Sequence, residues 1–259
     1  MVIVNKFINI INSILDEISI DSKLSCLGAY EQGSYVLGYA DEFSDRDFIV
    51  FWEKNLPDIN SRIKVLKNEK AIIHEIKNVT KIDIGFDLFK IDNQLVNIAH
   101  RIGLEKLEKI KNIKEYSVES LRAVYNLQKA QIIFDPTNRI KEIQNQAIIK
   151  DKDKRIFIET FSTKISYLLR ELEIAVKRDS KLRFLNIYAE ILDYLSILSL
   201  LKDDLTVVYT KWYEKMVTDP DLKQIYENIS RDINLESWMS EVLNYANHID
   251  IKPSKTLRA

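Results

Sequence analysis

Residues 33–52 read GSYVLGYADEFSDRDFIVFW, and the apolar run at the end of this stretch predicts a β-strand from Asp45 to Trp52. Successive side chains of a strand point to opposite faces, so Asp45 and Asp47 project to one side and Arg46 to the other. At a separation of ~5 Å and an effective dielectric of about 20, the two carboxylates repel each other by roughly 3 kcal/mol. A divalent cation between them would remove this repulsion.

Gly33-Ser34, separated from Asp45 by ten residues, supplies groups that suit the other half of such a site. A residue without a Cβ atom lets the backbone approach a ligand closely. A backbone N–H and a serine hydroxyl at that point can hold phosphate oxygens. The stretch therefore predicts a metal-dependent nucleotide site.

The residues around this stretch mix helical and strand patterns. The apolar spacing near the N-terminus is that of an amphipathic helix, and a turn at Asp92-Asn93 suits left-handed backbone angles between two strands. The elements we expect are a helix over 4–20, a strand over 24–30, a loop or short helix over 34–44, the strand over 45–52, a helix after Pro57, and strands over 81–90 and 94–100.

The second half of the chain is predicted to be helical. All five glycines lie within the first 103 residues, and from Ser117 onward apolar residues recur with a period close to 3.6. The clearest positions are Phe157, Phe161, Ile165, Leu168, Leu172 and Ala175, and then Leu185, Tyr188, Leu192, Leu195 and Leu198. Breaks are expected at Asp135-Pro136-Thr137 and Asp219-Pro220-Asp221. We therefore expect an α+β protein: a mixed sheet with flanking helices over 1–114, and an all-α helical bundle over 115–259.

Composition sets limits on the class of protein. The 259 residues are 46% hydrophobic, which is ample for a buried core. The formal charge of -1 does not indicate nucleic-acid binding, although a local basic groove is compatible with it. Cys26 is the single cysteine, which excludes an intramolecular disulfide and fits a reducing cytoplasm. The sequence contains no uninterrupted apolar stretch of about 18 residues, so we expect no membrane span. We also expect no export signal.

The pattern of Gly33-Ser34, a ten-residue gap and Asp45-Arg46-Asp47 resembles the nucleotidyltransferase superfamily, which includes DNA polymerase beta, CCA-adding enzymes and antibiotic nucleotidyltransferases. The match is to its minimal bacterial branch, in members that carry a helical C-terminal domain. The resemblance implies transfer of a nucleoside monophosphate, AMP from ATP or the equivalent from another nucleoside triphosphate, to a hydroxyl acceptor with release of pyrophosphate. Two divalent ions, normally Mg²⁺, would bridge the carboxylates and the triphosphate.

By that resemblance, Asp45 and Asp47 are catalytic metal ligands, and the Gly33 backbone and Ser34 hold the outer phosphates. Tyr35 lies in the nucleotide loop, where its ring would stack on the base or pack the loop down. Ser44, directly before the carboxylate pair, completes the expected nucleotide-binding set.

A third carboxylate is usual in active members of this superfamily. Where that acid is on the second strand of a hairpin, the equivalent position here is Asn97, which cannot be an anionic ligand or base. Where it is on the strand beside the Asp-any-Asp strand, Asp83 or Asp87 qualifies, and both would lie on one face of a regular strand. We expect Asp87 to be the ligand, because Phe86, Leu88 and Phe89 place it in the more apolar part of the strand.

The acceptor is assigned to the helical half. In antibiotic-modifying relatives the acceptor is an aminoglycoside or lincosamide; in toxin–antitoxin relatives it is a protein side chain or an RNA end. A non-catalytic nucleotide-binding module is the alternative from another class. His74 and His100, isolated in apolar surroundings, are interpreted as structural histidines.

Overall fold

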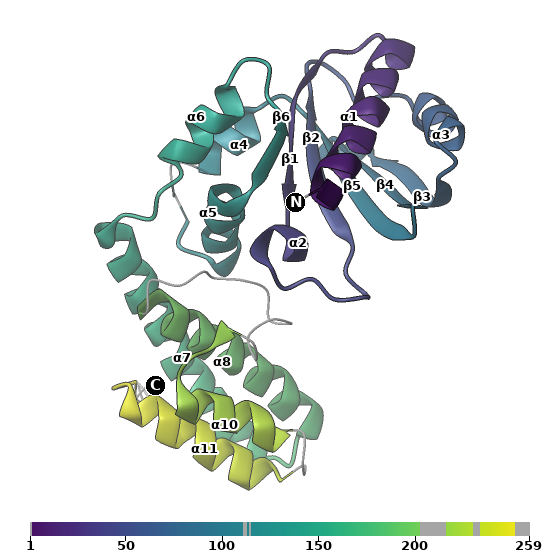
Figure 1. The fold of residues 1–259 in the computed structure, drawn as a ribbon. Helices are drawn as coiled ribbons and strands as arrows, with labels where there is room; N and C mark the ends of the chain where they lie inside the picture. Colours follow the sequence, from purple (N-terminus) through teal and green to yellow (C-terminus); the bar gives the residue numbers. More distant parts are fainter. Residues whose placement is uncertain (1, 111–112, 114, 203–215, 230–233, 252–259) are drawn as a thin grey trace. The chain divides into compact units, whose positions relative to one another are not determined.

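The structure is a computed structural model, shown as a ribbon in Figure 1. The residues that it describes are 2–110, 113, 115–202, 216–229 and 234–251. They form a six-stranded mixed sheet with flanking helices and a separate set of long helices, so the predicted α+β architecture is confirmed.

The chain divides into two compact units, and the division is not a single cut. The first unit is Met1–Ile113 with Ala123–Ile148, and the second is Lys114–Arg122 with Ile149–Ala259. The predicted boundary after residue 114 assigned all of the later residues to the helical bundle. The difference arises because residues 131–134 form an edge strand of the sheet, which brings their neighbours into the first unit.

The sheet has the strand order β3-β4-β5-β2-β1-β6. β2 and β5 are parallel, and every other neighbouring pair is antiparallel. The strands are β1 (Cys26–Gln32), β2 (Arg46–Trp52), β3 (Ile72–Val79), β4 (Ile84–Ile91), β5 (Gln94–Ile102) and β6 (Gln131–Phe134).

Two of these strands were not predicted. β3 is an edge strand in which polar residues are mixed among apolar ones, and none of its positions is fully buried. β6 has four residues and follows a helix with neither glycine nor proline between them. The predicted turn between β4 and β5 is confirmed, because Asp92 and Asn93 have positive φ angles of 48° and 64°.

Helices α1 (Val2–Ser22) and α3 (Ile59–Asn68) cover one face of the sheet (Figure 1). Asp58 caps α3, because its Oδ2 accepts hydrogen bonds from the backbone N–H groups of Asn60 at 2.8 Å and Ser61 at 3.2 Å. The core of the first unit lies between these helices and the sheet. Its members include Phe7, Ile11, Ile14, Ile18, Phe48, Val50, Trp52, Leu66, Phe89 and Ile98.

Shorter elements complete the first unit. α2 is a single turn next to β1, and α4 and α6 contact each other beyond the β6 edge. The division between the units falls within α5. The bounds of these helices are α2 (Ser34–Leu37), α4 (Glu105–Ile110), α5 (Val118–Lys129) and α6 (Arg139–Gln146). The predicted break at Asp135-Pro136 therefore separates a strand from a helix.

The second unit is built on a helical hairpin of α7 (Asp151–Lys177) and α8 (Lys181–Lys202). α11 (Leu235–His248) packs against both of these helices, and α10 (Pro220–Ile229) packs against α11. The predicted apolar positions of α7 are all buried. Those of α8 are buried except for Leu185, which is 40% exposed. The break at Asp219-Pro220 is confirmed by the start of α10.

α8 is also long and apolar enough, by composition, to cross a membrane. Among the described residues it is the one helix with this property, and 61% of its most apolar window is buried within the structure. Such burial is what a central helix of a helical bundle shows.

Candidate nucleotide site

The Gly-Ser turn and the carboxylate strand meet at one end of the sheet. Gln32, the last residue of β1, is opposite Asp47 in the antiparallel ladder, so Gly33 follows directly beside that carboxylate. A Cβ atom at position 33 would lie 2.7 Å from Asp47 Oδ2, and the backbone there has a φ of 85°. Both observations require glycine: the angle suits a residue without a side chain, and the space is filled by the carboxylate.

Ser34 begins the single turn α2, whose chain is held by two backbone hydrogen bonds. Leu37 N–H donates to the Gly33 carbonyl at 3.1 Å, and Tyr39 N–H donates to the Ser34 carbonyl at 2.9 Å. The Ser34 residue is only 4% exposed, yet its hydroxyl has no hydrogen bond to any residue that the structure describes. A hydroxyl in such a place is available to a ligand.

The predicted alternation of Asp45, Arg46 and Asp47 is confirmed by what Arg46 contacts. The Arg46 guanidinium lies on the face covered by α1, 4.4 Å from the centre of the Phe7 ring. Its Nε and one terminal nitrogen each donate to a different carboxylate oxygen of Glu31, both at 2.7 Å. This buried bidentate pair fixes the start of β2 and leaves Asp47 on the other face.

Asp45 and Asp47 differ in their surroundings. Asp47 Oδ1 accepts a hydrogen bond at 3.0 Å from the side-chain amide of Asn97, its partner in the parallel ladder with β5. Asp45, directly before β2, is half-buried and has no hydrogen bond or ion pair to any other described residue. A half-buried carboxylate without a partner is unusual and fits a site that a cation completes.

Asp87 is not part of this site, and its prediction as a metal ligand is corrected by the geometry. In the β4–β5 ladder Asp87 is opposite Ile98, which belongs to the core on the α1 and α3 face. Asn97 is opposite Asp47 on one side and opposite Leu88 on the other. On β4 it is therefore Leu88, and not Asp87, that lies on the same face of the sheet as Asp47. Side chains on opposite faces of one sheet cannot share an ion.

Asp87 has a different set of partners. It is fully buried and forms an ion pair with Arg62 of α3, while its Oδ2 lies 2.8 Å from His100 Nε2. Trp52 Nε1–H donates to His100 Nδ1 at 3.0 Å, so the imidazole proton lies on Nε2 and is donated to Asp87. Burial lowers the pKa of Arg62, and the charge of Asp87 opposes that shift. This network stabilises the core, and His100 is a structural histidine as predicted.

Asp83, the alternative third acid, is exposed in the turn before β4, with a φ of 51°. Ile84, the next residue, is opposite Arg101, four residues along β5 from Asn97. At about 3.3 Å per residue, this separation places Asp83 more than 10 Å along the strands from Asp47 and Asn97. Neither predicted third carboxylate joins Asp45 and Asp47, and Asn97 stands beside Asp47 instead.

Tyr35 and Ser44 are connected through a residue that the sequence did not single out. Tyr35 Oη donates to Gln94 Oε1 at 2.7 Å, and Gln94 Nε2 donates to the Ser44 carbonyl at 3.0 Å. The Ser44 hydroxyl donates to Asp41 Oδ1 at 2.8 Å. These bonds give both residues a role in holding the loop before β2. Their direct contact with a nucleotide stays a prediction.

Phe43 is the exposed aromatic ring of this loop. The Asp41–Ser44 turn is closed by the Ser44 N–H to Asp41 carbonyl bond at 3.1 Å, and Phe43 N–H donates to Asp41 Oδ1 at 3.1 Å. The Phe43 side chain at the tip of this turn is 84% exposed, two residues before Asp45. Its exposure could not be predicted from sequence, since an aromatic residue in a loop is as often packed as exposed.

The donor set of the site determines which ion it fits. Among the residues that the structure describes, no three His, Cys, Asp or Glu side chains converge into a metal-binding group. Mg²⁺ is commonly held by one or two carboxylates together with substrate phosphates. Asp45 and Asp47 fit one such ion bound with a triphosphate. They do not provide the third carboxylate that would hold the second expected ion.

Comparison with known proteins gives a distant likeness. No protein-family model matches the sequence, and no curated protein matches it. Among solved structures, the chain is similar to a nucleotidyltransferase-like protein from Exiguobacterium sibiricum 255-15. The sequence identity is 13% and the TM-score is 0.45, over 86% of this chain and 68% of that chain. A likeness of this degree assigns no activity, so the function has to be inferred from the residues of the site.

Proposed function

We propose that this chain is a metal-dependent nucleotidyltransferase that binds a magnesium-bound nucleoside triphosphate, ATP by preference, and transfers its nucleoside monophosphate to a hydroxyl acceptor. The observation that carries the proposal is the close approach of Gly33 to Asp47. The Ser34 hydroxyl, next to Gly33 in sequence, and the Asp45 carboxylate, close to Asp47 in sequence, have no hydrogen bond or ion pair to other described residues. A phosphate-compatible turn and two carboxylates are thereby brought to one end of the sheet.

Each residue has a defined part in this proposal. The Ser34 hydroxyl and the nearby backbone hold the outer phosphates, and Asp45 and Asp47 hold the ion. The ion, when bound, neutralises charge on the triphosphate and favours departure of pyrophosphate. Arg46 and Glu31 fix the backbone of Asp45 and Asp47 from the opposite face, because their ion pair is buried and bidentate.

The acceptor hydroxyl is the least defined part of the reaction. The acceptor classes named by the resemblance are an aminoglycoside or lincosamide antibiotic, a protein side chain and an RNA end. We propose a small-molecule acceptor, because the resemblance to antibiotic-modifying members includes a helical C-terminal domain.

A second candidate function is a nucleotide-binding module without catalysis. Asn97 supports it, because the residue opposite Asp47 is an amide, which offers no general base for the acceptor hydroxyl. Release of pyrophosphate from ATP separates the two functions. A transferase releases it in the presence of its acceptor, and a binding module does not.

The metal-site assignment is tested by calorimetric titration of ATP with and without Mg²⁺. Wild type is expected to bind ATP more than tenfold more tightly with the metal, because Asp45 and Asp47 repel an uncomplexed triphosphate. The double variant Asp45→Asn with Asp47→Asn is expected to lose this metal dependence while its fold is retained, since asparagine has the same shape.

Asp83→Asn is the matched control for this titration. It also replaces a carboxylate by an amide in the first unit, but on the exposed turn away from Asp47. We expect ATP binding to keep its full magnesium dependence in this variant. Equal magnesium dependence in the double variant and in wild type would disprove the site.

Phe43 is expected to stack on the base of the bound nucleotide. Stacking of a base on an aromatic side chain contributes about 1–3 kcal/mol, so Phe43→Ala should weaken ATP binding by about tenfold, and Phe43→Trp should preserve it. The measurement is the same titration in the presence of Mg²⁺. Ile72→Ala removes another exposed apolar side chain, at the β3 edge, and should have no effect. Unchanged affinity in Phe43→Ala would rule out the stacking role.

A further inference from the structure

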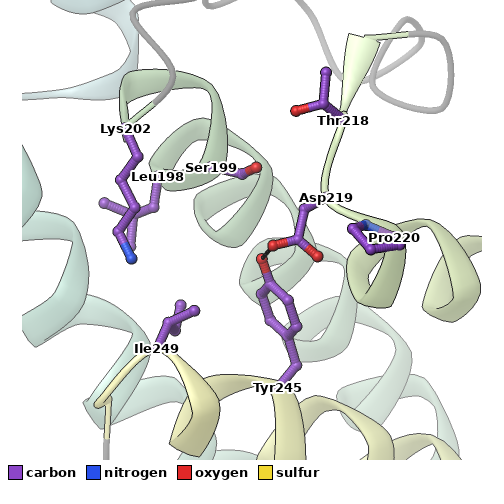
Figure 2. Close-up of a pocket in the computed structure, with 8 residues that line it drawn as sticks. All are labelled: Leu198, Ser199, Lys202, Thr218, Asp219, Pro220, Tyr245 and Ile249. Atoms are coloured by element: carbon purple, nitrogen blue, oxygen red, sulfur yellow. Dashed lines mark hydrogen bonds between the residues drawn. The ribbon is translucent and has the colours of Figure 1, made fainter.

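The helical unit contains a cavity that the nucleotide site does not use. It has a volume of about 310 Å³ and lies between the end of α8, the start of α10 and the end of α11 (Figure 2). This size is at the lower end of the range for small-molecule pockets. All of its lining residues belong to the second unit, whereas Asp45 and Asp47 belong to the first.

Helix α8 contributes a positive charge and a hydroxyl to the cavity wall. Figure 2 shows Lys202 extending from the end of α8 along the cavity, with Ser199 one turn earlier on the same helix. Neither side chain forms a hydrogen bond or ion pair with another residue in the described part of the chain. Ser199 as a residue is 8% exposed, whereas Lys202 is exposed at the end of the helix. An ammonium and a hydroxyl in this arrangement suit a carboxylate.

The other side offers a negative charge that has one hydrogen-bonding position left. Asp219 Oδ1 caps α10 by accepting from the N–H groups of Asp221 at 3.0 Å and Leu222 at 3.1 Å. Asp219 Oδ2 accepts from Tyr245 Oη at 2.9 Å, drawn as a dashed line in Figure 2. Each carboxylate oxygen accepts about two hydrogen bonds, so Oδ1 is saturated and Oδ2 has one position for a further donor.

Apolar groups complete the wall. Leu198, Ile249 and the ring of Tyr245 line the cavity between its two charged sides. A ligand that satisfies all three parts has an anionic group, a cationic donor and a compact apolar side chain. We propose that this cavity binds a small zwitterion of the α-amino-acid type, with its carboxylate at Lys202 and Ser199 and its ammonium group at Asp219.

The test uses L-leucine as the probe, titrated into the full-length protein and followed by ligand-observed NMR. Isovalerate lacks the ammonium group and isoamylamine lacks the carboxylate, so each should bind at least tenfold more weakly than L-leucine. Lys202→Met keeps the aliphatic stem and removes the charge, and it should weaken L-leucine binding at least tenfold. Ser199→Ala should weaken it about fivefold, as expected for loss of one neutral hydrogen bond.

Lys181→Met is the matched control, because Lys181 is an exposed lysine at the other end of the same helix. It should bind L-leucine as wild type does, and so should Asp47→Asn, which belongs to the nucleotide site. Three results would overturn the proposal: no saturable binding of L-leucine up to about 10 mM, equal binding by Lys202→Met, or isovalerate binding as tightly as L-leucine.

Discussion

Asp87→Asn is expected to lower the free energy of unfolding by about 3 kcal/mol, the cost of leaving a buried charge without its partner. Arg62 is fully buried, and its guanidinium pairs with Asp87 in the core between α3 and the sheet. Asparagine has the shape of aspartate but no charge, so the loss comes from electrostatics and not from a cavity. Urea unfolding followed by circular dichroism measures it.

The same variant tests the revised role of Asp87. Asp83→Asn, an exposed change of the same chemistry, should shift the unfolding free energy by less than about 0.5 kcal/mol. Folded Asp87→Asn should also bind magnesium-bound ATP as wild type does, because Asp87 faces away from Asp47. A large loss of metal-dependent ATP binding with little loss of stability would restore Asp87 to the site.

Asn97→Asp is expected to strengthen metal binding and to raise pyrophosphate release. A carboxylate in place of the amide would stand about 3 Å from Asp47, where two like charges repel by roughly 5 kcal/mol at an effective dielectric of 20. The apo variant should therefore be less stable than wild type and should be stabilised strongly by Mg²⁺. A third carboxylate also supplies a general base, which typically contributes a factor of about 10²–10⁴ in rate.

Thermal unfolding with and without Mg²⁺, and a pyrophosphate assay with ATP and candidate acceptors, measure these effects. Asn93→Asp is the matched control, because it adds the same charge on the exposed β4–β5 turn. It should respond to Mg²⁺ as wild type does. If Asn97→Asp shows no gain in metal-dependent stability, Asp47 is not positioned to share an ion with its neighbour on β5.

Local patterns predicted much of the molecule. Alternation along residues 45–52 gave the correct faces for Arg46 and Asp47, and the apolar period of the second half gave buried positions along α7. The Asp92-Asn93 pair gave the hairpin turn. Each of these features depends on residues that are close in the sequence, which is why a single sequence was sufficient to predict them.

The features that were missed depend on which strands are neighbours. β5 lies between β4 and β2, and this order puts Asp87 on the face opposite to that of Asp47. The alternation of side chains along a strand could not distinguish Asp83 from Asp87, because residues four apart lie on the same face. Arg62, which pairs with Asp87, is 25 residues away in the chain. Such a partner is visible only after the chain has folded.

The most direct test of the proposed nucleotide site is a crystal structure with a non-hydrolysable ATP analogue and Mn²⁺ in place of Mg²⁺. Anomalous scattering locates the ion independently of the protein model. The ion is expected in direct contact with carboxylate oxygens of Asp45 and Asp47, and the outer phosphates are expected at the Ser34 hydroxyl. An ion or a triphosphate bound elsewhere, with Asp45 and Asp47 in contact with neither, would contradict the proposal.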